Sequence, residues 1–142
     1  MKVIMASDHG GFTLKEKIKK TLSKTHILFE DFGAKKLDQN DDYQDFIIPA
    51  MTAILKNKNS KGIIICRNGV GVSILANKFK GIRAGLCFSE NHVKSARNDD
   101  DINVLALPAN YISKRRAMKL VKTFLNTPFS GEARHKRRLA KI

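Results

Sequence analysis

The sequence is poor in the residues that build a stacking surface for nucleic acids. Its 142 residues include no tryptophan, two tyrosines and eight phenylalanines, and these do not alternate with basic residues. It has neither zinc-finger spacing nor another recognisable DNA-binding motif. The net charge of +14 comes from lysines scattered over every expected helix and from the C-terminal stretch ARHKRRLAKI. We therefore expect a solvated basic surface that suits small anionic substrates, and no nucleic-acid partner.

The chain also lacks any long uncharged apolar run, so we expect no transmembrane helix and no membrane partner. Its first residues, MKVIMASDHG, lack the apolar block and cleavage site of a signal peptide, which favours a cytoplasmic protein. The two cysteines, Cys66 and Cys87, are then expected to be free thiols rather than a disulfide. No repeat or low-complexity linker divides the sequence, which predicts a single domain over residues 1–142.

Short apolar runs alternate with helix-like segments along the whole chain. We expect strands at 2–7, 26–33, 62–66, 82–87 and 103–108. We expect helices at 11–24, about 43–56, 71–79, 89–98 and 112–125, followed by a basic tail at about 128–142. Pro49 lies inside the second helix and disfavours its first turns. Five apolar strands separated by helices predict an α/β fold, a Rossmann-like three-layer sandwich around a five-stranded parallel sheet.

Chemically capable residues gather where these strands end, and in a parallel sheet this edge forms the ligand crevice. The third strand ends at Cys66 and continues into the glycine-containing loop RNGVGVS, which opens a helix. Free N–H groups there favour an anion and the thiolate form of the cysteine. Two glycines one residue apart also fit a simple tight turn, and a free cysteine is commonly a small buried apolar residue. Asp8 and His9 follow the first strand and face the same crevice; Cys87 has no such loop, so we expect it to be structural.

The stretches SDHGGFTLKEKI, DDYQDF, GIIICRNGVGVSILANKFKGIRAGLC, NDDDINVLAL and ARHKRRLAKI occur in a characteristic order and spacing. Over essentially the whole chain they resemble the ribose-5-phosphate isomerase B family, to which galactose-6-phosphate isomerase subunits are related. The resemblance implies a cofactor-free, metal-free aldose–ketose isomerase of the pentose phosphate pathway, which interconverts ribose 5-phosphate and ribulose 5-phosphate. It also implies homodimers with active sites shared between subunits, and leaves open whether dimers pair into tetramers.

The same resemblance implies roles for individual positions. Cys66 matches the base that moves a proton between C2 and C1 through a cis-enediolate. The backbone amides from about Asn68 to Ser73 match the anion hole for that enediolate. Arg134 and Arg138 match the two phosphate-binding arginines of the tail. The substrate-binding positions are then Asp8, His9, Tyr43, Arg67, Gly69, Val70, Gly71, Ser73, Asp100, Arg134 and Arg138.

Several positions depart from the family pattern, and most of them lie in the site itself. Arg67 and Asn68 stand where the family has glycine and threonine or serine, so a ring-assisting hydroxyl is missing and Arg67 must adopt negative φ or be strained. Asp99–Asp101 replaces His-Asn-Asp, whose histidine is the ring-opening acid or base. Asn110 replaces a phosphate-binding arginine, and Gln44 replaces a proline. Compared with the usual Gly-Gly-Arg-His of the family, the tail stretch SGEARH carries one extra residue.

These departures leave three alternatives. The protein is a working isomerase in which Cys66, Asn68 and Asp99 act, with ring opening by Asp99 or by the sugar's own spontaneous opening. It is an isomerase for another phosphorylated aldose, such as a hexose or allose phosphate. Or it is a catalytically impaired homologue that still binds sugar phosphates. Losing one general acid or base costs about 10²–10⁴-fold, which weakens an enzyme without abolishing it and favours the first alternative.

Overall fold

The computed structural model describes residues 1–142 and contains one five-stranded sheet and six helices. The strands are β1 (Lys2–Ser7), β2 (Leu28–Asp31), β3 (Ser60–Cys66), β4 (Ala84–Leu86) and β5 (Val104–Pro108). The helices are α1 (His9–Leu22), α2 (Gln44–Lys56), α3 (Val70–Ala76), α4 (Glu90–Asp100), α5 (Lys114–Asn126) and α6 (Ala133–Leu139). All strand pairs are parallel, in the order β2-β1-β3-β5-β4. The predicted Rossmann-like α/β sandwich is confirmed.

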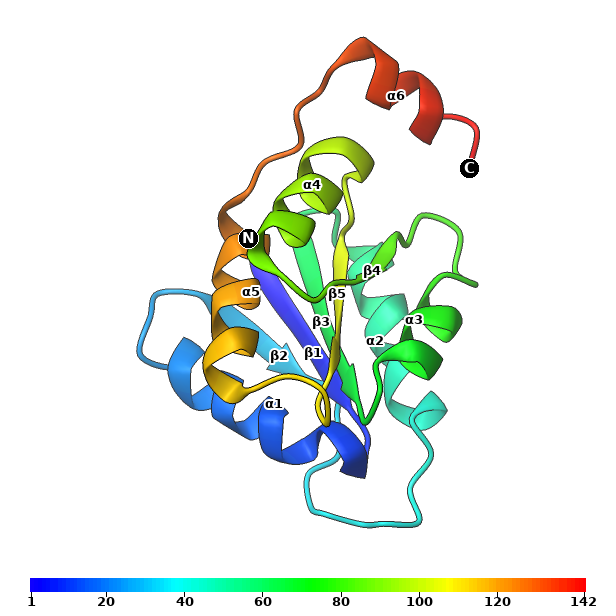
Figure 1. The fold of residues 1–142 in the computed structure, drawn as a ribbon. Coiled ribbons are helices and arrows are strands. Elements are labelled where there is room, and N and C mark those ends of the chain that lie inside the picture. Colours follow the sequence, from blue (N-terminus) through cyan, green and yellow to red (C-terminus); the bar gives the residue numbers. More distant parts are fainter.

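Two apolar cores, one on each face of the sheet, hold the three layers together (Figure 1). Helices α1, α4 and α5 cover one face, where Ile18 and Phe124 pack in the same cluster as Ile63 of β3. Helices α2 and α3 cover the other face, where Met51 of α2 packs with Ile64 of β3. Successive residues of β3 therefore serve opposite cores, as the alternation of side chains along a strand requires.

The main differences from the sequence-based expectation lie at the sheet edges and in the tail. Strands β2 and β4 are shorter than expected, and no residue of either is fully buried. Pro49 is accommodated inside α2, on the exposed side of that helix. The basic tail contains one additional helix, α6, which packs against α4. None of the helices combines the length and the apolar character that crossing a bilayer requires.

The topology creates a crevice between the carboxyl ends of β1 and β3. From β1 the chain passes to β2 on one side, and it returns through α2 to β3 on the other side. Neighbouring strands whose connections leave in opposite directions open a gap beyond their carboxyl ends, where α/β proteins bind ligands. Asp8 follows β1 at this edge, and Cys66 ends β3, beside Pro108 of β5. In Figure 1 this edge is at the bottom, and α6 lies at the top, beyond the amino ends of the strands.

Candidate active site

Cys66 lies at the end of β3 with its sulfur directed toward the loop that follows. Its side chain is buried, with 6% of the residue exposed. The backbone N–H of Gly69 donates to Sγ over 3.2 Å, which stabilises negative charge on the sulfur. Gly69 has φ 75°, and a Cβ there would lie 2.6 Å from the Leu86 Cδ1 atom. Any side chain at position 69 would therefore strain the turn that directs this amide toward Cys66.

The two unusual residues of the loop fit without backbone strain. Asn68 Oδ1 accepts a hydrogen bond from the Val70 N–H over 3.0 Å and lies 3.7 Å from Cys66 Sγ. Asp101 is the one non-glycine residue with positive φ, so the φ of Arg67 is negative. The sequence had left open whether Arg67 would be strained, and it is not. The N–H group of Gly71, in the first turn of α3, has no acceptor within the chain and is free to meet an anion.

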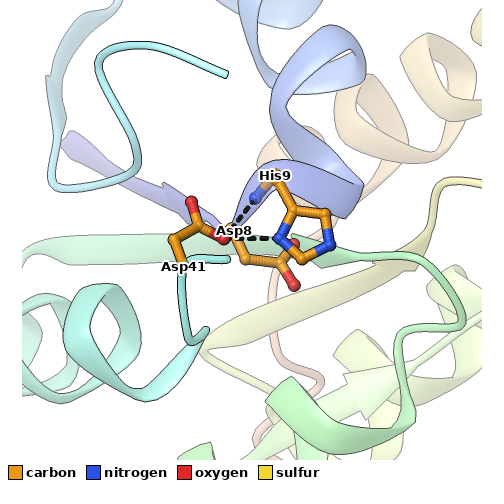
Figure 2. A group of neighbouring side chains, drawn as sticks. All are labelled: Asp8, His9 and Asp41. Carbon is orange, nitrogen blue, oxygen red and sulfur yellow. Dashed lines mark hydrogen bonds and ion pairs between the residues drawn. The ribbon is translucent and has the colours of Figure 1, made fainter. Parts of the chain in front are cut away.

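At the end of β1, two acidic side chains surround the first residue of α1 (Figure 2). Asp41 Oδ1 accepts from the backbone N–H of His9 over 2.9 Å and lies 2.5 Å from its ring Nδ1. Asp8 caps α1 by accepting from the Gly11 N–H over 3.1 Å. Burial raises the pKa of Asp8, although its bond from Gly11 and the nearby His9 act in the opposite direction. These contacts hold a carboxylate and an imidazole in fixed positions at the crevice.

Close packing brings these segments together with the loop after β3. A Cβ on Gly10 would lie 2.5 Å from the Arg67 Cγ atom, so the stem of Arg67 lies directly against the start of α1. A Cβ on Gly71 would lie 3.1 Å from the Tyr43 ring. The β1 end, the loop before α2 and the loop after β3 thus form one surface. Of the predicted residues, this surface carries Asp8, His9, Tyr43, Cys66, Arg67, Asn68, Gly69, Val70, Gly71 and Ser73.

The remaining four predicted residues lie at the opposite edge of the same chain. Asp99 and Asp100 end α4, which precedes the amino end of β5, and Arg134 and Arg138 belong to α6. Helix α6 packs against α4. In Figure 1, α6 and the end of α4 both lie far from the start of α1. Within one chain, Cys66 therefore has neither Asp99 nor the tail arginines beside it.

Asp99 is held in its ionised form. It accepts hydrogen bonds from Asn98 Nδ2 over 2.7 Å and from Ser95 Oγ over 3.1 Å. The bond from Asn98 is the main cause that lowers the pKa of Asp99, and His135 and Arg134 lower it further by their charge. His135 Nδ1 lies 3.8 Å from the Asp99 carboxylate. At neutral pH this group is a carboxylate, which can accept a proton but has none to donate.

One group of side chains has the spacing of a metal site. The ligand atoms of Asp8, His9 and Asp41 lie within 4.8 Å of one another. Asp41 Oδ2 is buried and has no hydrogen-bond partner. The Nδ1 atom of His9, however, is already engaged by Asp41 Oδ1. The hydrogen bonds of His9 with Asp41 and of the Gly11 N–H with Asp8 therefore account for the placement of these side chains without a metal ion.

The matching family model is that of the Ribose/Galactose Isomerase family, and it covers residues 3–142. The chain belongs to this family. A probable ribose-5-phosphate isomerase B of Mycoplasma genitalium is 40% identical over 141 residues, which cover 99% of this chain and 92% of that protein. A putative sugar phosphate isomerase of Bacillus subtilis is 37% identical, with 100% of this chain and 95% of that protein covered. The resemblance inferred from the motifs is confirmed.

Solved structures of this isomerase family share the fold. The crystal structure of a ribose 5-phosphate isomerase from Thermotoga maritima aligns with a TM-score of 0.94 and 41% identity, covering 99% of this chain and 95% of that chain. The Mycoplasma genitalium ribose-5-phosphate isomerase B, solved with bound ribulose-5-phosphate, aligns with a TM-score of 0.94 and 40% identity. The alignment covers 99% of this chain and 92% of the Mycoplasma genitalium chain.

Sequence reasoning missed Asp41, which makes the two contacts to His9. Asp41 lies in an irregular loop, 32 residues away from its partner in the chain. The doubled aspartate just before Tyr43 was the available signal, because an acidic pair beside a pocket residue suggests a partner for a nearby imidazole. Its neighbour Asp42 is exposed and makes no side-chain hydrogen bond, so the pattern alone could not distinguish the two.

Proposed function

We propose that this protein interconverts ribose 5-phosphate and ribulose 5-phosphate, with residues 1–142 acting as one isomerase domain in the cytoplasm. The observation that carries the proposal is the convergence of the Cys66 sulfur and the Gly69 amide at the carboxyl edge of the sheet, 3.2 Å apart. The 40% identical Mycoplasma genitalium enzyme, solved with ribulose-5-phosphate, supports the choice of substrate. The chemistry needs no cofactor, because only protons change place.

In the proposed reaction the Cys66 thiolate removes the proton from C2 of the open-chain aldose. The electrons of the broken C–H bond form the C1–C2 double bond, and the carbonyl electrons move to O1 to give a cis-enediolate. The thiol then returns the proton to C1, and the proton on O2 passes to O1 as the C2 carbonyl forms. Amides of the loop, including the unpaired N–H of Gly71, stabilise the enediolate oxygen. Such a donor contributes about 10²–10³-fold where charge develops.

We further propose that a second copy of the chain completes each site. Asp99 and the tail arginines lie at the sheet edge opposite Cys66, so they reach a Cys66 only across an interface. Exposed apolar residues on α3, Val70 (44%) and Ile74 (57%), support such an interface beside the catalytic loop. The partner's arginines would hold the phosphate dianion. The ionised Asp99 would accept the anomeric hydroxyl proton as the bond between C1 and the ring oxygen breaks, and would return that proton to the ring oxygen, with Asn68 as a hydrogen-bond donor to the sugar.

A coupled assay for ketose formation from ribose 5-phosphate tests the proposal. We expect turnover by the unchanged protein and a loss of at least about 10²-fold in Cys66→Ala, because the proton-transferring group is removed. Cys87→Ala is the matched control: Cys87 is a fully buried thiol outside the site, so its variant should retain turnover. Turnover that is indifferent to Cys66→Ala would refute Cys66 as the base.

The altered loop favours a second candidate, isomerisation of another phosphorylated aldose. Arg67 is exposed, lies against Gly10 and replaces a residue without a side chain, so it changes the space available to the sugar. A panel of pentose, hexose and allose phosphates, assayed side by side, decides between the substrates. A higher kcat/KM for a hexose or allose phosphate than for ribose 5-phosphate would establish this candidate. Inertness toward all of them, with binding retained, would identify a catalytically impaired binding protein.

A further inference from the structure

A polar cavity lies at the amino edge of the sheet, at the end opposite Cys66. It has a volume of about 470 Å³ and is formed where α2 ends, where β3 and β5 begin and where α4 ends. Two of its eleven lining residues are hydrophobic. Its charged lining consists of four cationic side chains and one carboxylate: Lys58, Lys61, Arg83, Arg97 and Asp101. The cavity therefore carries an excess of positive charge.

Lys61 is the less exposed of the two lysines in this lining. Its ammonium lies half-buried over the Phe124 ring and donates to the backbone carbonyls of Phe124 and Leu125, at 3.1 and 3.2 Å, and it has no carboxylate partner. Burial, together with the nearby charge of Arg97, lowers the pKa of Lys61 to about 8, while Asp101 acts weakly in the opposite direction. The chain thus holds two cations, Lys61 and Arg97, close to the same aromatic ring.

Asp101 neutralises only part of this charge, because both arginines share it. Arg97 Nη1 and Arg83 Nη2 each donate to one of its carboxylate oxygens over 2.7 Å. Arg97 is 6% exposed and is also tied to the Ile102 carbonyl over 2.6 Å. Neither Arg97 Nη2 nor Arg83 Nη1 donates to any acceptor in the chain. Held in place by their other bonds, the two guanidinium groups keep N–H donors for an additional anion.

We propose that this cavity binds a phosphate dianion, either inorganic phosphate or the phosphoryl group of a small phosphate ester, as a second anion site. Guanidinium N–H groups and an ammonium around one space are the donors that recognise phosphate. A bound dianion would compensate the unpaired charge of Lys61 and accept from the free arginine donors. The cavity volume also accommodates the organic part of an ester. This site is separate from Cys66, because the two lie at opposite edges of the sheet.

Backbone amide NMR during a titration tests the site without relying on activity. With inorganic phosphate or with AMP as the probe, the Gly81 and Asn103 amides should shift, independently of the Gly69 and Gly71 amides of the candidate active site. Lys61→Met keeps the apolar stem and should weaken this binding by about 10- to 100-fold. Lys122→Met, which alters an exposed lysine outside the cavity, is the matched control and should bind as the unchanged protein does.

The two probes distinguish the sources of the phosphate. Tighter binding of AMP than of inorganic phosphate identifies an ester site, and equal binding identifies a phosphate site. If neither probe shifts Gly81 and Asn103, or if Lys61→Met binds as tightly as Lys122→Met, the proposal is wrong. Failure of the isomerase assay would leave these results unaffected, because the amides report each site separately.

A pH series on the unchanged protein keeps the proposal testable if Lys61→Met does not fold. Sulfate is the probe, because it stays a dianion throughout. The groups around Lys61 are Lys58, Arg83, Arg97 and Asp101, with the α5 carbonyls, and the pKa of Lys61 is lowered to about 8. Sulfate affinity should therefore fall as the pH rises from 7 to 9. Affinity that stays constant over this range would overturn the role of Lys61.

Discussion

At the scale of single residues, the contact between His9 and Asp41 decides which ring nitrogen faces the crevice. Because the Asp41 carboxylate accepts from Nδ1, that nitrogen carries a proton and Nε2 is left for the substrate. Asp41 contacts His9 through two bonds, to the ring and to the backbone N–H. Asp41 is therefore a positioning residue for the proposed reaction.

We expect Asp41→Ala to lower kcat/KM for ribose 5-phosphate by about 10- to 100-fold, the value of a hydrogen bond to a charged group. Asp41→Asn keeps an oxygen that can accept from His9 and should recover part of the loss. Asp42→Ala changes the exposed neighbouring aspartate and serves as the control. Steady-state kinetics on the three variants check this. Equal losses in Asp41→Ala and Asp42→Ala would show that loop charge, rather than His9 orientation, is responsible.

The loop glycine offers a second test at this scale. Gly69→Ala requires a positive φ for alanine and places its Cβ 2.6 Å from Leu86. We expect a loss of about 1–3 kcal/mol in the free energy of unfolding, and a larger loss of activity because the amide turns away from Cys66. Gly131→Ala is the comparison: Gly131 has a similar φ of 68°, but a Cβ there would make only an ordinary contact, 3.7 Å from the Lys136 Cε atom. Urea denaturation of both variants should show the smaller cost at Gly131; equal costs would mean that the contact with Leu86 is relieved easily.

How far the site could be predicted from the sequence depended on how local each contact is. Cys66 and the Gly69 amide are three residues apart on one strand-to-helix turn, so the motif alone placed them together. The relation between Asp99 and Cys66 was not local. Their motifs suggested one site, but α4 runs antiparallel to the strands and carries Asp99 to the opposite edge. Sequence spacing gives no information on that separation, which only the packed sheet reveals.

At the scale of whole elements, the strands buried on both faces were predicted well and the short elements were not. Strands β1, β3 and β5 are continuous buried runs, which the apolar pattern predicts directly. Strand β2 is an edge strand whose residues alternate between exposed and half-buried, so the apolar run HILF overstated its length. Helix α6 has one buried residue, His135, and therefore almost no apolar periodicity to detect.

Helix α1 is attached to β2 by a buried ion pair, which predicts a large stability effect. Lys15 is fully buried, and its ammonium donates to Asp31 over 2.6 Å and to the Ala34 carbonyl over 3.0 Å. Lys19 also contacts Asp31 over 2.6 Å. We expect Asp31→Asn to lower the free energy of unfolding by about 2–3 kcal/mol, because it removes the buried carboxylate that pairs with the Lys15 ammonium and leaves the more exposed Glu16 as its carboxylate partner. Urea denaturation measures this.

The matched control is Glu30→Gln, which removes an exposed ion pair with Lys2 one residue earlier on the same strand. That pair should contribute less than about 1 kcal/mol to the free energy of unfolding.

The pH dependence of stability gives a further check on Asp31. Burial alone would raise the pKa of Asp31, but bonds from Lys15 and Lys19 outweigh it and lower the pKa. The contribution of Asp31 to the free energy of unfolding should therefore be complete above its ordinary pKa of 3.8, and it should be lost as the pH falls below that value. Equal costs of the two substitutions at pH 7 would contradict the buried pair.

At the scale of the whole molecule, the chain divides the proposed chemistry between two ends of one sheet. The Cys66 sulfur and the loop amides proposed to stabilise the enediolate lie beyond the carboxyl ends of the strands, and the arginines proposed to bind phosphate lie on α6 beyond the amino ends. In the proposed dimer, a symmetric pair of chains would bring each end of one copy to the opposite end of the other and so create two identical composite sites. The high net charge of +14 would then serve the anionic substrate at sites that neither copy contains alone.

This division predicts that two inactive variants complement each other. Cys66→Ala and the double variant Arg134→Ala/Arg138→Ala should each lose activity, because each spoils both sites of its own dimer. A mixed dimer contains one site with both defects and one site with neither. Unfolding and refolding an equimolar mixture makes half of the dimers mixed, so about one quarter of the wild-type activity should return. The unmixed variants, refolded separately and then combined at once before subunits exchange, are the control and should stay inactive. If the refolded mixture also stays inactive while size-exclusion chromatography shows dimers, then the arginines do not act at the partner's Cys66.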